Sequence, residues 1–97
     1  MRKITEKACR AFQNGNNVTI SNTQVKIEDN MAKMFLWGNL IAKKDLLTGK
    51  TLINLQGYNT ATTKERLNGL SGVQLTQKNW QLYLNGEPIS SCEWVQV

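Results

Sequence analysis

The 97-residue sequence contains no histidine, one proline and two cysteines. The lack of histidine and the small number of cysteines exclude several kinds of catalytic and metal site. Without histidine, a nucleophile would need a carboxylate, lysine or tyrosine as its base, and a Cys/His zinc site cannot be completed within one chain. The seven acidic residues show no spacing that would converge several carboxylates on one cation. We therefore expect no enzymatic activity, no metal site and no cofactor.

Long apolar runs are also missing. No stretch of about 18 apolar residues could span a membrane, and no secretory hydrophobic segment follows Met1. Cys9 and Cys92 stand near opposite ends of the sequence and could form a disulfide only if those ends met in space. These features predict a cytoplasmic protein that does not associate with membranes, in which Cys9 is a small buried helix residue and Cys92 a strand residue.

Positive charge is what the sequence has in excess. Twelve basic residues stand against seven acidic ones, for a net charge of +5. An excess of this sign favours anionic partners, nucleic acid among them. Because ordinary soluble domains often carry a net charge of this size, the charge alone does not decide the partner.

The pattern of apolar residues predicts an α+β domain spanning residues 1–97. Helical spacing of apolar residues predicts a helix from Ile4 to Phe12, which Asn14-Gly15 would end. Short alternating segments follow, and Asn85-Gly86 is the strongest hairpin signal among them. We expect one small antiparallel sheet of six to eight short strands, with two short helices packed on one face.

The second helix is expected in the stretch from Thr62 to Leu70. Thr62 would cap its N-terminus, with Glu65 at the spacing of a capping box. Gly69 would end it in the left-handed conformation. Leu67 and Leu70 would then anchor the helix to the sheet.

Several of these segments together carry a resemblance to a known family. The most specific are Thr63-Lys64-Glu65-Arg66-Leu67-Asn68-Gly69-Leu70 (TKERLNGL) and Tyr83-Leu84-Asn85-Gly86 (YLNG). Through these motifs, the sequence resembles a family of small uncharacterised proteins of tailed bacteriophages, which is one of the domains of unknown function. The resemblance covers nearly the whole sequence. The resemblance implies a phage protein made in the bacterial cytoplasm, and it implies no activity and no functional residues.

The residues themselves suggest a nucleic-acid site around a basic hairpin loop from Lys43 to Lys50. Basic side chains near exposed aromatic rings suit single-stranded nucleic acid, because the rings can stack on bases. Lys26 and Lys33 could extend the basic surface, and Phe35 is a further possible platform. The predicted contacts are phosphate binding by Lys43, Lys44 and Lys50, a second patch of Lys64 and Arg66, and base stacking by Tyr58 or Trp37.

Two alternatives stay open at this point. Trp37, Trp80 and Trp94 would more often be core residues in a chain this small, and a charged hairpin loop is usually only solvated. The protein could instead be an interaction module that binds or inhibits a host or phage protein, in host take-over or anti-defence, possibly as a homodimer. An exterior rich in Asn, Gln and Thr, together with free strand edges, would support that function.

Overall fold

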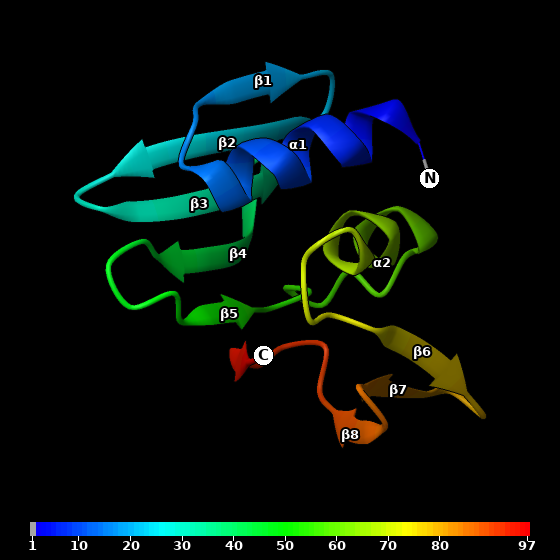
Figure 1. The fold of residues 1–97 in the computed structure, drawn as a ribbon. Helices are drawn as coiled ribbons and strands as arrows, with labels where there is room; N and C mark the ends of the chain where they lie inside the picture. The colour runs from blue at the N-terminus through cyan, green and yellow to red at the C-terminus, as the bar shows by residue number, and fades with distance from the viewer. Residues whose placement is uncertain (1) are drawn as a thin grey trace.

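The computed structural model describes residues 2–97, which form two helices and nine strands (Figure 1). The helices are α1 (Lys3–Asn14) and α2 (Ala61–Asn68). The strands before α2 are β1 (Val18–Ile20), β2 (Thr23–Glu28), β3 (Met31–Leu36), β4 (Asn39–Asp45) and β5 (Thr51–Ile53). Those after α2 are β6 (Leu75–Lys78), β7 (Gln81–Leu84), β8 (Glu87–Ile89) and β9 (Val95–Gln96).

The α+β class is confirmed, but the prediction of a single sheet is wrong. The strands form a six-stranded antiparallel sheet in the order β1-β2-β3-β4-β5-β9 and a separate three-stranded sheet, β6-β7-β8. The division follows from local pairing, since two-residue turns join β6 to β7 and β7 to β8. The chain then returns to the large sheet, where β9 pairs with β5.

Left-handed two-residue turns set the register of the hairpins. Both central residues have positive φ in four of them: Asp29-Asn30, Trp37-Gly38, Asn79-Trp80 and Asn85-Gly86. Asn85-Gly86 is thus confirmed as a hairpin turn. Placing Trp37 and Trp80 in the core is wrong, because these turns hold them outward, with 52% and 94% of each residue exposed.

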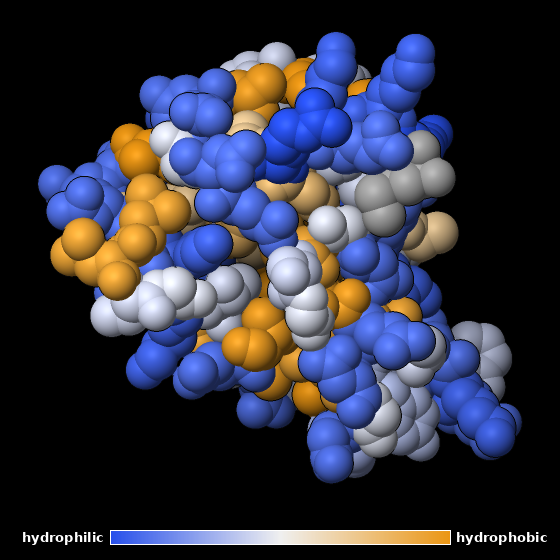
Figure 2. All heavy atoms as spheres, in the orientation of Figure 1, coloured by the Kyte–Doolittle hydropathy of each residue, from blue (hydrophilic) through white to orange (hydrophobic). Residues whose placement is uncertain are grey.

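Both helices pack on the same face of the large sheet, as predicted. α1 buries Ala8, Ala11 and Phe12 and contacts β1, β2 and β3. α2 lies beside α1 and contacts β4 and also β6 of the small sheet (Figure 1). Figure 2 shows hydrophilic side chains over most of the face that carries α1. The core lies between the two helices and one face of the large sheet, and it continues to the buried Leu75, Leu82 and Leu84 of the small sheet.

The ends of α2 differ from the prediction. Its N-cap is Thr60, whose hydroxyl accepts from the Thr63 backbone N–H at 3.2 Å, so the expected Thr62 cap with Glu65 does not form. Gly69 at the C-terminus is right-handed, with φ of −76°. The helix begins two residues earlier than predicted because Thr60, with extended backbone, can turn its hydroxyl toward the free N–H groups.

Arg66 is the largest fully buried side chain, with 1% exposed, and it connects three elements. Its Nε donates to Thr23 Oγ1 on β2 at 3.0 Å, and its Nη1 donates to Thr5 Oγ1 on α1 at 2.7 Å. The same Nη1 lies 3.0 Å from Glu65 Oε1, which also accepts from the Thr5 hydroxyl at 2.5 Å. A buried charge is tolerated only with such partners, so these hydrogen bonds define how α1, α2 and β2 fit together.

The two cysteines are free and lie in opposite environments. Cys9 is buried on α1, as predicted, and its thiol donates to the Arg66 carbonyl at 3.2 Å. Burial raises the pKa of the Cys9 thiol to about 11, although the nearby Arg66 charge partly opposes the rise. Cys92 lies exposed in the turn before β9, so its placement in a strand is wrong.

We expect a thiol reagent to modify one cysteine per native chain near pH 8, namely Cys92. The thiolate is the reactive form, and burial keeps Cys9 both protonated and inaccessible. The measurement is the number of thiols that react in the native protein and then in denaturant. A Cys92→Ser variant should show none until it unfolds. Equal rates for both thiols in the native wild-type protein would contradict this environment for Cys9.

Candidate nucleic-acid interface

The face of the large sheet that points away from α1 is open, and this surface is called the open face below. Strands alternate their side chains, so each strand that buries residues against the helices sends the others to the open face. On β3, Ala32, Met34 and Leu36 are buried, whereas Lys33 and Phe35 are half-buried. β3 lies inside the sheet, between β2 and β4, with one face against the helices and the other on the open face.

Three lysines form a row across the open face. Lys26 on β2 pairs directly with Lys33 on β3, and Lys33 pairs with Lys43 on β4. Directly opposed residues on antiparallel strands have Cα atoms about 4.5–5.5 Å apart. Among the described residues, Glu28 forms an ion pair with this row, with its Oε1 3.9 Å from Lys33 Nζ. Like charges at such positions disfavour the sheet, so the arrangement is unusual for a surface that only needs to be solvated.

A β-bulge on β4 turns Lys43 toward the open face. Met34 pairs with Ala42 while Phe35 pairs with Leu40, so Ile41 is the extra residue. Without the bulge, the alternation from Leu40 would place Lys43 on the helix side, because a shift of one residue exchanges the two faces. Bulges recur where a sheet aims a particular side chain, and here the bulge completes the lysine row.

An exposed tryptophan adjoins the lysine row. Lys43 Nζ lies 4.4 Å from the centre of the Trp94 ring, and Trp94 is 36% exposed just before β9. This cation–π contact holds the ring beside the lysines. Half-buried Phe35 and Leu40 form a cross-strand pair farther along the same face. The surface thus offers both cationic groups and ring faces, the two components that bind single strands.

Of the lysines predicted around residues 43–50, two lie on the open face. Lys43 and Lys50 line one shallow depression with Met31, Asp45 and Leu52. Lys43 and Lys44 belong to β4 and not to a loop, so they point to opposite faces. Lys44 instead lies beside Phe12 and Gln13 of α1, on the other side of the sheet.

The second predicted patch is not formed. Arg66 is buried, and its guanidinium donates to Thr5, Thr23 and Glu65, so it does not offer a phosphate contact. Lys64 is half-buried on α2 and its Nζ donates to Gln77 Oε1 at 2.7 Å. The sequence predicts an exposed Arg66 because a charged residue on a short helix usually faces solvent. The hydroxyl groups that accept its hydrogen bonds come from α1 and β2, which are distant in the sequence.

The predicted stacking residues are exposed but lie outside the lysine row. Tyr58 is 49% exposed in the segment before α2, and Trp37 is in the turn between β3 and β4. Trp94, which was expected in the core, is the aromatic ring in contact with a lysine. No sequence signal near Trp94 indicates this, since its neighbour Lys43 is about fifty residues away in the chain.

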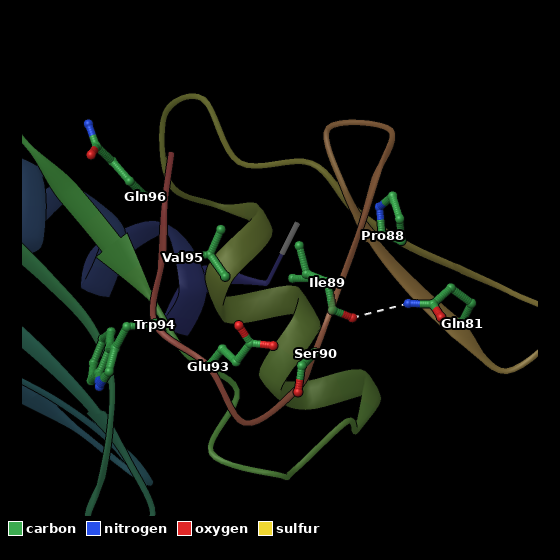
Figure 3. A pocket seen from close by; sticks show the side chains of 8 residues that line it. All are labelled: Gln81, Pro88, Ile89, Ser90, Glu93, Trp94, Val95 and Gln96. Carbon is green, nitrogen blue, oxygen red and sulfur yellow. Dashed lines mark hydrogen bonds between the residues drawn. The ribbon is translucent and has the colours of Figure 1, made fainter.

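A cleft of about 600 Å³ continues from Trp94 between the two sheets. Figure 3 shows Trp94 on the side toward the large sheet, with Glu93, Ser90 and Ile89 on the other side of the C-terminal segment. Gln81 of β7 and Pro88 of β8 form the far wall. The Gln81 side chain donates to the Ile89 carbonyl at 3.1 Å, which holds that wall in place.

Residues 2–97 contain neither a membrane-spanning helix nor a cluster of metal-binding side chains. Their helices include none with the length and apolar character that crossing a membrane requires. In the same residues, no group of three or more Cys, Asp or Glu side chains is arranged to hold a metal ion.

Comparisons with known proteins identify the family. Neither the curated proteins nor the solved structures contain a match to this sequence. A family model described as the Kyanoviridae Gp96 protein matches residues 1–97, which is the full sequence. The resemblance to bacteriophage proteins is therefore confirmed, and the chain belongs to the Kyanoviridae Gp96 protein family of phage proteins.

Proposed function

We propose that this phage protein is a non-enzymatic accessory protein that binds single-stranded nucleic acid on its open face, in the cytoplasm of the bacterial host. The observation that carries the proposal is the lysine row, Lys26-Lys33-Lys43, across three neighbouring strands. A polyanion lying across the strands would neutralise three like charges at once. Release of its counterions would supply affinity.

The shape and chemistry of the open face favour a single strand over a duplex. A duplex is read mainly by an element that enters a groove, such as a helix or a two-stranded ribbon. Here the lysines lie within a sheet face, beside the Trp94 ring and the half-buried Phe35. Unpaired bases can stack on such rings while the phosphates contact the lysines, and this mode is tolerant of sequence.

The test is the salt dependence of binding to a fluorescent single-stranded oligonucleotide, measured by anisotropy. With the three row lysines and Lys50 in contact, the slope of log K against log salt should be about −3, from roughly 0.7 per phosphate. A duplex of the same sequence should bind more weakly. Absence of binding even at about 50 mM salt, where such contacts are strongest, would overturn the proposal.

Binding of a protein is a second candidate function, and apolar surface on the open face supports it. The open face carries four half-buried apolar side chains that expose part of their surface: Met31, Phe35, Leu40 and Leu52. A host or phage protein, or a second copy of this chain, could cover that surface instead. A stoichiometric partner that copurifies after nuclease treatment, or a stable dimer in light scattering without oligonucleotide binding, would favour this function.

A further inference from the structure

Trp80 is the most exposed large apolar residue in the described chain, and nothing in folding explains its position. It lies in the turn between β6 and β7 with 94% of the residue exposed, so its ring adds no core packing. Its φ is +68°, and the preceding Asn79 has φ of +52°. A bulky residue is strained in this region, where glycine is the favoured residue of such a turn. Strain at an exposed aromatic residue points to a contact outside the chain.

The surroundings of Trp80 connect it to the open face. Gln81, the next residue, lines the cleft whose other end is Trp94. Lys78 pairs with Gln81 across the hairpin, so the two side chains lie on the same side of the small sheet. Trp94 in turn contacts Lys43 of the lysine row. The cleft thus has Trp94 at one end and Gln81 at the other (Figure 3). The Trp94 contact with Lys43 joins it to the lysine row, and Gln81 joins it to the hairpin that carries Trp80.

We propose that Trp80 is a second stacking platform and that a bound single strand continues from the open face along this cleft to the β6–β7 hairpin. The inference rests on the proposed nucleic-acid binding and extends its site. Lys78 would contact a phosphate near the hairpin, and the Trp80 ring would stack on a base. Glu93 lies in the cleft, where a carboxylate repels phosphate but accepts hydrogen bonds from base N–H groups, such as the N3–H of thymine. The strand would accordingly pass with its bases toward the cleft and its phosphates toward Lys78.

The test compares wild type with Trp80→Gly on oligothymidylates from about 4 to about 16 nucleotides, the range of single-strand site sizes. For wild type, affinity should rise with length until the strand reaches the hairpin. The variant should match wild type on the shortest oligomers that bind and should bind the long ones about 5- to 150-fold more weakly, since it loses one stacked base. Trp80→Tyr keeps a ring and should restore most of the loss.

The thermal stability of Trp80→Gly is the control for misfolding. The binding results then distinguish the proposed nucleic-acid binding from its extension to Trp80. Glycine suits the positive φ at this turn, so Trp80→Gly should be at least as stable as wild type in thermal unfolding. If wild type binds short oligomers and the variant is unchanged at every length, only this extension is wrong. An equal loss at every length would also overturn the extension. If wild type binds no oligomer, the proposed function and the extension fail together.

Discussion

Replacing Lys26, Lys33 and Lys43 together with glutamine is expected to weaken binding of single-stranded DNA roughly 100-fold at about 0.1 M salt. The row lysines face one another across β2, β3 and β4, so one strand could contact all three. Loss of three contacts at roughly 0.7 per phosphate should also reduce the salt slope by about 2. The measurement is anisotropy of a labelled oligonucleotide over a range of salt concentrations.

The matched control removes the same charge from the opposite face. Lys3, Lys7 and Arg10 are exposed on α1, and replacing all three with glutamine also lowers the net charge by three. Binding through the open face predicts a change of only a few-fold in this control. Equal losses in the two triple variants would mean that affinity follows net charge and not the lysine row. The free energy of unfolding of the row variant should change by less than about 1 kcal/mol, because relief of the opposed like charges offsets the lost Lys43 contact with Trp94.

Replacing Arg66 with methionine is expected to lower the free energy of unfolding by roughly 2–4 kcal/mol. The substitution leaves the buried hydroxyls of Thr5 and Thr23 without their donor. The Glu65 carboxylate is 34% exposed, so solvent screens its ion pair and most of the loss comes from the buried hydrogen bonds. For a domain of this size, the melting temperature should fall by more than about 10 °C.

Lys64→Met is the control for that substitution, since it removes a neighbouring charge from the same helix. Lys64 is half-buried and makes one side-chain hydrogen bond, to Gln77, so its change should stay within about 0.5 kcal/mol. Thermal and denaturant unfolding of both variants give the comparison. If Arg66→Met were as stable as Lys64→Met, the buried network would not hold the helices on the sheet.

The parts of the fold that local chemistry determines could be predicted from the sequence. Asn85-Gly86 forms its hairpin because both residues tolerate positive φ, and Gly15 ends α1 in the left-handed conformation. The α1 residues Ala8, Ala11 and Phe12 are buried as their spacing indicates. Trp80 was misplaced because the alternation of Leu82 and Leu84 extends back to it, whereas the turn interrupts the strand.

The candidate site could be predicted only in part, because it depends on register. Lys26, Lys33 and Lys43 meet only if the turns at 29–30 and 37–38 have two residues each and the bulge falls at Ile41. An error of one residue would send Lys43 to the helix side, and no local signal specifies the bulge. Arg66 and Trp94 were misassigned for a related reason, since their partners come from distant parts of the chain.

The most direct test of nucleic-acid binding on the open face is an NMR titration of the labelled protein with a single-stranded oligonucleotide. We expect the largest shifts at backbone amides around Lys33 and Lys43 and at the Trp94 indole, with little change along the exposed side of α1. Shifts that cluster on α1, or a spectrum that does not change at saturating oligonucleotide, would contradict the account.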